Sequence, residues 1–219
     1  MTNIAVAKRV ISQEIAGLEA LKDSIDGDFN TMVERIYDNV HTKSGRVILS
    51  GMGKSGHIAR KIAATIASTG TPAFFVHPGE ASHGDMGMIT KSDVVILLSN
   101  SGETHELRDI ISYTRRFAIP LVALVRRAES MLVEAADIAI VLPEVPEASP
   151  IGVPTTSTTM MLACGDALAV APTDAVFLDD IGMNCKAGRA FGFTTIKVDD
   201  PDKALDELAA LVELPLRAD

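Results

Sequence analysis

Residues 93–104, Asp-Val-Val-Ile-Leu-Leu-Ser-Asn-Ser-Gly-Glu-Thr, join an uninterrupted apolar run to a loop rich in hydroxyl side chains. Such a run is typical of a strand that is buried on both faces of a parallel sheet. The loop stands where a strand passes into a helix, and there backbone amides and hydroxyls can bind a phosphate. Strand-to-helix turns favour the same residues when they bind nothing, so Thr104 as a structural helix cap is the alternative.

The composition favours one substantial α/β core. Hydrophobic residues make up 47% of the 219 residues and aromatic residues only 4%, so Ala, Val, Ile, Leu and Met must fill the core. That composition suits helices layered on a parallel sheet. The formal net charge is −9 and no basic block occurs, so we expect no nucleic-acid partner.

The sequence also indicates where the protein acts. No apolar run reaches the roughly 18 residues that a membrane-spanning helix needs. The residues that follow Met1 carry charges on a helical pattern, unlike a signal peptide. Cys164 and Cys185 are isolated, without metal-ligand or redox spacing. We therefore expect a cytoplasmic protein with reduced cysteines and no membrane contact.

Two amphipathic helices are predicted before any strand. Apolar residues recur with helical spacing from about residue 4 to residue 42, and Asp26-Gly27-Asp28 interrupts them. No apolar strand leads into this Asp-Gly-Asp, so we interpret it as a turn between helices rather than a phosphatase nucleophile loop. From Arg46 onward, short apolar runs alternate with helical segments. The expected strands are 47–49, 73–76, 94–98, 121–125 and 138–142.

Helical patterns separate these strands. They cover about 54–69, 103–116, 128–136 and 155–170, and a turn-rich piece lies at 78–90. The predicted fold class is therefore α/β, a three-layer αβα arrangement with a five-stranded parallel sheet, preceded by two helices. Ligands bind such sheets beyond the carboxyl ends of the strands, so the loops that follow the strands carry the chemistry.

The loop after the first strand, Ser50 to His57, ends in Gly-Lys-Ser like a nucleotide-binding P-loop. Position 48, where a P-loop needs glycine, is Ile48, so a nucleotide site is not expected. What remains is a glycine-rich turn that places Lys54 and Ser55 at the start of a helix. This turn and the loop of residues 99–104 can both reach one phosphate.

The loop of residues 77–85 is dense in titratable groups. His83 is either a substrate contact or a structural residue that caps or hydrogen-bonds locally. Metal binding by His77, His83 and Asp85 is an alternative, but their spacing is not diagnostic. We predict neither a metal nor a cofactor.

A proline-rich loop follows the last strand and leads to the hydroxyl cluster of residues 155–159. Its acids Glu144 and Glu147 are either solvated or placed for chemistry. A carboxylate beside a phosphate site is what proton abstraction from a sugar needs.

Four segments of the chain form a specific combination. They are Gly-Met-Gly-Lys-Ser-Gly-His at 51–57, the segment 68–85, Ser-Asn-Ser-Gly-Glu-Thr at 99–104 and Pro-Thr-Thr-Ser-Thr-Thr at 154–159. The combination resembles the sugar isomerase (SIS) domain family, and within it the arabinose-5-phosphate isomerases of lipopolysaccharide sugar synthesis. The resemblance implies a five-stranded parallel sheet, a homotetramer with sites at subunit interfaces, and interconversion of ribulose 5-phosphate and arabinose 5-phosphate.

The resemblance also implies roles for single residues. The phosphate-binding residues of the family match Ser55, Ser99, Ser101 and Thr104 of this chain. The family's residues implicated in isomerisation match Lys54, Glu106 and Glu147. Asn100 and His83 complete the expected substrate-binding set. Aldose–ketose isomerisation needs a carboxylate base, a cation at the oxygens and an anchored phosphate. We expect Glu147 or Glu106 as the base and Lys54 at the oxyanion. Glu106 near a helix start can alternatively serve only the helix dipole.

The likeness, which begins at about residue 5, ends at Ala171, so we predict two domains, 1–171 and 172–219. In the family the last helix continues into a segment ending in His-Pro-Gly-Gly, whose histidine belongs to the active site, and usually into paired CBS domains. Neither is found in these residues. A catalytically weak phosphosugar-binding or regulatory SIS module is therefore the alternative to an enzyme.

The tail resembles the final βαβα segment of haloacid dehalogenase-like hydrolases, in which paired aspartates help to bind magnesium. The segment that begins at Ala175 leads into a helix at 186–191, a strand at 194–198 and a helix at 201–213. Asp179 and Asp180 match the paired aspartates, but no other part of that metal site is identifiable. Phosphatase activity is therefore not expected.

Overall fold

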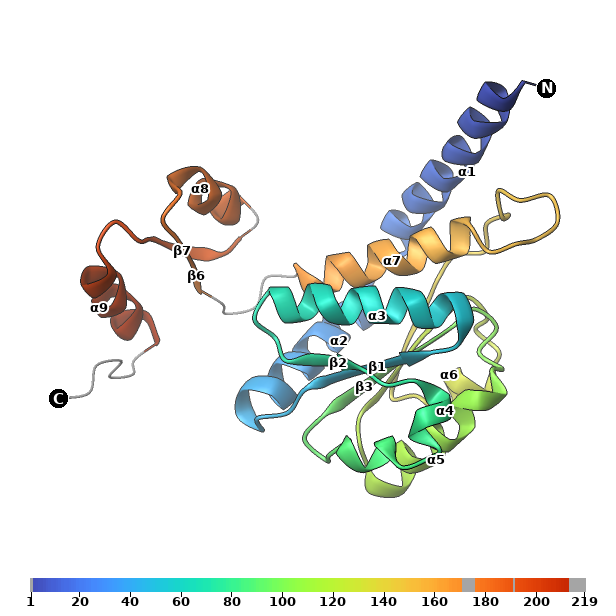
Figure 1. Ribbon diagram of the computed structural model, residues 1–219, viewed down its shortest axis with the longest axis horizontal. Coiled ribbons are helices and arrows are strands. Elements are labelled where there is room, and N and C mark those ends of the chain that lie inside the picture. The colour runs from blue at the N-terminus through green and yellow to red at the C-terminus, as the bar shows by residue number, and fades with distance from the viewer. Residues whose placement is uncertain (1, 171–175, 191, 213–219) are drawn as a thin grey trace. The chain divides into compact units, whose positions relative to one another are not determined.

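The computed structural model describes residues 2–170, 176–190 and 192–212. The chain forms two compact units, Met1–Val170 and Ala171–Asp219. The strands of the first unit are β1 (Val47–Gly51), β2 (Ala73–Phe75), β3 (Val94–Ser99), β4 (Leu121–Val125) and β5 (Ile138–Val141). They form one sheet in the order β2-β1-β3-β4-β5, and every pairing is parallel (Figure 1). The predicted five-stranded parallel sheet is confirmed.

Strand β3 lies at the centre of this sheet and every one of its residues is buried. Its side chains alternate between two cores, because Val94, Ile96 and Leu98 pack on one face. Val95 and Leu97 pack on the other face. Full burial of each such side chain stabilises the fold by about 1.5–3 kcal/mol. The apolar run before the hydroxyl loop therefore fixes the middle of the fold.

Helices cover both faces of the sheet. One face carries α1 (Asn3–Ser24), α2 (Gly27–Tyr37), α3 (Gly53–Ser68) and α7 (Thr156–Ala169). The other carries α4 (Pro78–Ala81), α5 (Arg108–Phe117) and α6 (Met131–Ala135). Figure 1 shows α3 and α7 on one side of the strands and α4 and α5 on the other. The three-layer αβα class is thus confirmed. Among the described residues, no helix combines the length and the apolar character needed to cross a membrane.

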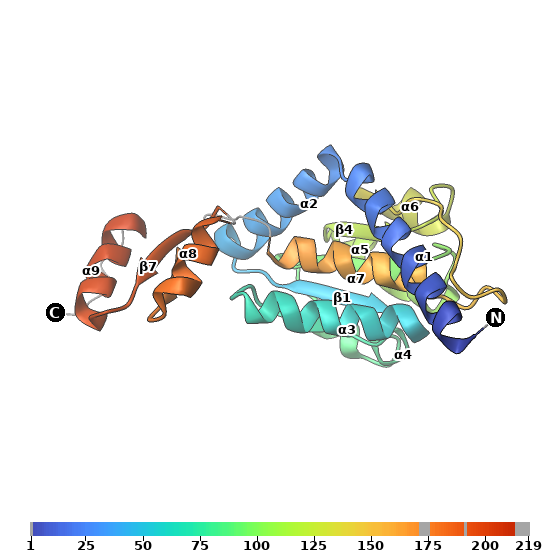
Figure 2. The ribbon, with the colours of Figure 1, turned by 90° about the horizontal axis from the view of Figure 1, so that it is seen from above.

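The two N-terminal helices are confirmed, and a turn joins them. Asp26 caps α2, because its Oδ1 accepts a hydrogen bond of 3.0 Å from the amide of Asp28. The acid therefore has a structural partner, which supports the interpretation as a turn between helices. Helix α1 packs on α7 at Gly17, where an added Cβ would lie 2.4 Å from Thr156 Cγ2. Figure 2 shows α1 beside α7.

The helix predicted at 103–116 begins later than expected. A 3-10 turn at His105–Leu107 comes first, and α5 starts at Arg108. Gly102 has φ +68°, a conformation that interrupts any helix and that glycine adopts without strain. Thr104 occupies the N-cap position of the 3-10 turn, as the cap alternative expects, but its side chain makes no capping hydrogen bond there. The helix predicted at 128–136 is likewise shorter, Met131–Ala135.

Two carboxylates close the amino ends of the strands. Asp93, which precedes β3, is fully buried and accepts hydrogen bonds from the Arg46 amide (2.9 Å), its Nε (3.0 Å) and its Nη2 (2.8 Å). The Thr90 amide adds a fourth at 2.7 Å. Burial by itself raises the pKa of Asp93, but the bonds from Arg46 and Thr90 outweigh it and lower the pKa. Asp137 accepts the Leu121 amide at 2.8 Å and so caps the start of β4.

The second unit is a small βαβα segment. Strands β6 (Val176–Asp179) and β7 (Thr194–Lys197) pair in parallel, and α8 (Gly182–Ala190) and α9 (Pro201–Val212) accompany them. Helix α8 begins before the predicted start at residue 186. Asp179 explains this, because its carboxylate accepts the Ile181 amide at 2.7 Å and the Asn184 amide group at 3.0 Å. The expected boundaries at Ala175, Phe191 and residue 213 lie outside the described residues.

Candidate functional site

The order of the strands in the sheet indicates where a ligand can bind. After β1 the chain crosses to β2 on one side, and after β3 it crosses to β4 on the other. The loops that leave these neighbouring strands therefore diverge, and parallel sheets bind ligands at the carboxyl ends of the strands at such a point. Gly51 of β1 pairs in register with Leu98 of β3. The loops after these two strands, which the sequence predicted to share a phosphate, thus start side by side.

The hydroxyl loop, residues 99–104, holds its own shape through hydrogen bonds. Ser99 Oγ lies 2.7 Å from Thr104 Oγ1 and accepts the Gly102 amide at 3.0 Å. Whichever of the two hydroxyls donates to the other, the second keeps a free hydrogen. Ser101 Oγ accepts the Glu103 amide at 3.2 Å, and its side chain is exposed. The loop therefore combines a fixed backbone with hydroxyl donors for an anion.

The start of helix α6 packs against this loop and forms hydrogen bonds with it. An added Cβ at Gly102 would lie 2.1 Å from Ser130 Oγ, so glycine is required there for space as well as for conformation. The Gly102 carbonyl accepts the Leu132 amide at 3.1 Å, and Glu103 Oε1 accepts the Met131 amide at 2.8 Å. Glu103 thus has a structural partner at the start of α6.

Lys54 and Ser55 lie in the first turn of α3, as predicted. Lys54 is exposed, and Ser55 is half-buried with its Oγ 4.0 Å from Met161 Sδ. The helix start presses against the end of β1, because an added Cβ at Gly56 would lie 2.5 Å from the Gly51 carbonyl oxygen. This close approach places the first amides of α3 beside the carboxyl end of β1, where they can face an anion.

Glu147 is held more firmly than the sequence indicated. Its Oε2 accepts the Thr155 amide (2.8 Å), the Thr155 hydroxyl (3.2 Å) and the Ser157 amide (3.3 Å), which join the proline-rich loop to the start of α7. Its Oε1 lies 4.0 Å from Arg126 Nη1. Burial by itself raises the pKa of Glu147, but hydrogen bonds from Ser157 and Thr155 outweigh it and lower the pKa. Glu147 is therefore an ionised and oriented carboxylate.

Arg126 is a site residue that the sequence reasoning missed. It follows β4 directly, and its amide donates to the Asn100 carbonyl at 3.2 Å. Both residues line a cavity of about 580 Å³ whose other walls come from the proline-rich loop, including Glu144, Glu147 and Ser149. The rule that ligands bind at the carboxyl ends of strands points to the first residue after β4 as well. That signal could have found Arg126.

Unpaired polar atoms mark the same edge of the sheet. In the described ranges, five buried side-chain atoms have no hydrogen-bond partner, namely Ser50 Oγ, Asn100 Oδ1, Arg126 Nε, Thr156 Oγ1 and Ser157 Oγ. All five stand at the end of a strand, just after one, or at the start of α7. Buried polar groups are normally paired, so their concentration here indicates a place where a ligand or water completes them.

Other predicted residues are not joined to this group by any interaction among the described residues. His83 is exposed beyond α4, and Glu106 is exposed in the 3-10 turn after the hydroxyl loop. No cluster of three or more His, Cys, Asp or Glu side chains suited to a metal occurs in the described part of the chain. His77 caps α4, because its Nδ1 accepts the Gly79 amide at 3.2 Å.

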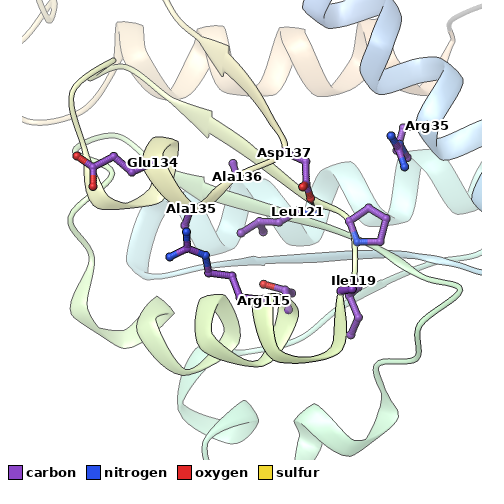
Figure 3. A pocket seen from close by; sticks show the side chains of 11 residues that line it. Arg35, Arg115, Ile119, Leu121, Glu134, Ala135, Ala136 and Asp137 are labelled. Atoms are coloured by element: carbon purple, nitrogen blue, oxygen red, sulfur yellow. Dashed lines mark hydrogen bonds between the residues drawn. The ribbon is translucent and has the colours of Figure 1, made fainter.

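A second cavity, of about 510 Å³, lies at the opposite edge of the first unit, where β4 begins. Figure 3 shows Arg35, Arg115 and Glu134 spread around it, with Asp137 between them. Asp137 is occupied by the Leu121 amide. The charges of the two arginines and the two acidic side chains in its wall cancel. None of the unpaired buried atoms of the described residues lines this cavity. The carboxyl edge is therefore the better candidate site.

Comparison with known proteins gives the same fold and a chemistry for its relatives. Residues 42–171 match the SIS domain family. Arabinose 5-phosphate isomerase KdsD of Francisella tularensis is 52% identical over 72% of this chain and 48% of its own length. The solved structure of E. coli CFT073 c3406 in complex with A5P has a TM-score of 0.73 and 40% identity, and covers 78% of this chain and 91% of that one.

A further relative includes the second unit. The protein RP505 of Rickettsia prowazekii is 43% identical over 95% of this chain and 64% of its own length. A match of that extent necessarily includes residues beyond Val170. The chain spans about half the length of the curated KdsD relatives it matches, 48–49%.

Proposed function

The chain belongs to the SIS domain family, and from that premise we propose that it isomerises a phosphosugar between its aldose and ketose forms. The proposed pair is ribulose 5-phosphate and arabinose 5-phosphate, which would feed lipopolysaccharide sugar synthesis. The observation that carries the proposal is the group of unpaired buried polar atoms at the carboxyl edge, beside a loop built to receive an anion. The relatives named KdsD and the c3406 complex with A5P support the choice of sugar.

The phosphate is the anchor of the proposed complex. The hydroxyl loop and the first turn of α3 supply hydroxyls and backbone amides at neighbouring strand ends. The protein as a whole carries a net charge of −9, so attraction of a phosphate has to be local. Ser55, Ser99, Ser101 and Thr104 are the proposed phosphate-binding side chains, with Asn100 and His83 as further substrate contacts.

The reaction moves one proton between carbons and one between oxygens. A carboxylate removes a proton from C1 of the ketose to give the C1–C2 enediolate. The O1 hydroxyl proton passes to O2, and the carboxylic acid returns a proton to C2, which gives the C1 aldehyde of the aldose. Lys54, exposed at the start of α3, is the proposed cation for the developing oxyanion. Glu147 and Glu106 are both candidates for the base. The hydrogen-bonded carboxylate of Glu147 supports its orientation for this step, and Glu106 supports its own candidacy by its exposed position in the 3-10 turn that follows the hydroxyl loop.

One observation favours the second candidate function, a phosphosugar-binding module with little turnover. Three hydrogen bonds from the start of α7 already occupy one oxygen of Glu147. The contacts of Ser157 and Thr155 with this carboxylate lower its pKa despite its burial. A carboxylate with a lowered pKa is a weaker base. The same contacts would suit a residue whose work is to hold the loop that borders a binding cavity.

A homotetramer with sites at the subunit interfaces is part of the proposal, as is a cytoplasmic location. Helix α1 supports the homotetramer, because it carries exposed apolar side chains in the single chain. Their exposed fractions are 71% for Ile4, 58% for Ile11 and 50% for Ile15. Apolar side chains in such a row favour burial against a partner. Sedimentation analysis of the full chain is expected to give four subunits, and α1 variants with Ile11→Gln and Ile15→Gln are expected to give smaller species.

The experiment that tests the function is an isotope exchange. Purified protein with ribulose 5-phosphate in D₂O is expected to yield arabinose 5-phosphate that carries deuterium at C2, because the proton passes through a solvent-exchangeable base. Calorimetric titration with arabinose 5-phosphate measures binding separately. Binding without product or exchange would contradict the enzyme and support the binding module. A protein that neither binds nor reacts would contradict both.

A further inference from the structure

The cavity at the carboxyl edge has an unpaired donor and an unpaired acceptor in its wall. Arg126 Nε and Asn100 Oδ1 are both buried without a partner. Their residues lie together, since the Arg126 amide donates to the Asn100 carbonyl at 3.2 Å, and both line the cavity of about 580 Å³. A buried polar group left unpaired is unfavourable, so a ligand that pairs with both is favoured.

Glu147 does not satisfy the Arg126 guanidinium. The separation of 4.0 Å between Arg126 Nη1 and Glu147 Oε1 exceeds the 2.7–2.9 Å or so of a charge-assisted hydrogen bond. The second oxygen of Glu147 is directed to the start of α7, where three donors hold it. Arg126 is also only 28% exposed, so bulk water does not fully solvate it. Its donors are thus available to a molecule in the cavity.

The chemistry of the wall selects the kind of ligand group. A phosphate at neutral pH mainly accepts hydrogen bonds and carries negative charge, and the acids Glu144 and Glu147 in the same wall repel a second such group. A sugar hydroxyl both donates and accepts, so it can pair with Asn100 Oδ1 and with Arg126. The donor and acceptor together suit neighbouring hydroxyl or carbonyl oxygens.

We propose that this cavity is a polyol subsite in which Arg126 and Asn100 bind oxygens of the sugar chain, while the hydroxyl loop holds the phosphate. The inference rests on the proposed function, because it assumes a phosphosugar as the ligand. It adds that recognition of the sugar is separable from recognition of the phosphate. Asn100, which lies within the hydroxyl loop, connects the two.

The test compares two phosphate esters that differ in the length of their polyol chain. Calorimetric titration gives the affinity of each variant for arabinose 5-phosphate and for glycerol 3-phosphate. Arg126→Met is expected to weaken arabinose 5-phosphate binding by about tenfold to a hundredfold, the usual range for a hydrogen bond to a charged group. Glycerol 3-phosphate binding should change by less than about threefold, within the usual variation of single contacts. Arg127→Met is the matched control, since Arg127 is the next residue and is exposed, and it should alter neither affinity.

Two further variants keep the test decisive if Arg126→Met folds poorly. Arg126→Lys keeps the charge opposite Glu147 but has no donor at the Nε position, so it should lose most of the same affinity. Asn100→Ala should also weaken arabinose 5-phosphate binding more than glycerol 3-phosphate binding. Full rescue by lysine, or equal loss for both esters in all variants, would overturn the proposal. A wild-type protein that binds neither ester would instead contradict the proposed function.

Discussion

The polar side chains at the two ends of the central sheet's strands differ in whether they have hydrogen-bond partners. At the amino edge, Asp93 has four donors at 2.7–3.0 Å, and Asp137 caps the neighbouring strand. At the carboxyl edge, the side chains of Asn100, Arg126 and three hydroxyl residues have atoms without partners. Paired groups stabilise the fold, whereas unpaired groups destabilise it unless something binds them. On this difference rests the proposal that the amino edge stabilises the fold and the carboxyl edge binds the ligand.

The largest expected effect is on turnover at the carboxyl edge. Glu147→Gln removes the negative charge but keeps an acceptor for the amides of Thr155 and Ser157. If Glu147 is the base, the rate of arabinose 5-phosphate formation should fall by about 10²–10⁴-fold, the usual contribution of general acid–base catalysis. Steady-state kinetics with ribulose 5-phosphate measure this, and KM should change little.

The matched variants for this prediction are Glu106→Gln and Glu129→Gln. Glu129 is exposed in the loop after β4 and should not alter the rate. If Glu106→Gln causes the large loss and Glu147→Gln does not, Glu106 is the base and Glu147 holds the loop. Equal and small effects of both would mean that neither carboxylate removes the proton.

The second effect is on stability at the amino edge. Asp93→Asn leaves Arg46 without its anion and replaces one acceptor oxygen by a donor among four donor groups. The free energy of unfolding should fall by about 2–4 kcal/mol. Asp137→Asn is the control, because Asp137 is exposed and holds one strand amide, and should cost about 0.5–1 kcal/mol. Urea denaturation measures both. If the folded Asp93→Asn protein also lost phosphosugar affinity by about 2–4 kcal/mol, the proposed division into a stabilising amino edge and a ligand-binding carboxyl edge would be wrong.

Asp93 also gives this edge a pH dependence. Its pKa in the folded protein is lowered, so the unfolded chain binds more protons between the folded pKa and the ordinary value of about 3.9. The stability from Asp93 is therefore fully present above pH of about 4 and is lost as the pH falls toward the folded pKa. Urea midpoints measured from pH 6 down to pH 3 should show a shallower decline for Asp93→Asn. An unchanged decline would mean that other carboxylates set the acid limit.

The sequence predicted the sheet because its strands are specified locally. The run 94–98 is apolar at every position, and only a strand covered on both faces uses such a run. The predicted start of α5 was wrong because the real start depends on the conformation of Gly102 and on the hydrogen bond between the side chains of Ser99 and Thr104. Neither feature has a helical or strand periodicity.

The candidate site was less accessible to sequence reasoning than the fold. The hydroxyl loop and the first turn of α3 are each continuous in sequence, so their residues could be named from motifs. The cavity of Asn100, Arg126 and Glu147 joins three loops that are far apart in the chain. Which loops meet in this cavity depends on which strands are neighbours in the sheet, and the local spacing of residues does not reveal the strand order. The fixed state of Glu147 likewise depends on contacts with α7.

A smaller effect is expected within the hydroxyl loop. Ser99→Ala removes the acceptor for the Gly102 amide and the partner of Thr104, so the loop loses two internal hydrogen bonds. Phosphosugar affinity should fall about tenfold, and stability by about 1–1.5 kcal/mol. Ser101→Ala should leave stability unchanged, because the exposed Ser101 side chain holds only one local turn. Calorimetry and thermal unfolding separate the two quantities. Equal effects of both variants on stability would mean that the buried bond has no special part in the loop.

The smallest expected effect tests whether the carboxyl edge depends on α1. At Gly17 an added Cβ would lie 2.4 Å from Thr156 Cγ2, whereas at Gly27 nothing lies within 4 Å. Gly27 is the first residue of α2, where the preference for alanine is smaller than in a helix interior, so Gly27→Ala should be neutral or slightly stabilising. Gly17→Ala gains about 0.5–1 kcal/mol of helix propensity in the interior of α1 but must displace Thr156, whose hydroxyl is one of the unpaired groups at the carboxyl edge. It should therefore lower stability by about 1 kcal/mol, as core overpacking does, and weaken phosphosugar binding as well. Loss of stability with unchanged affinity would show that Thr156 can move without disturbing the site, and would remove it from the set of residues that await a ligand.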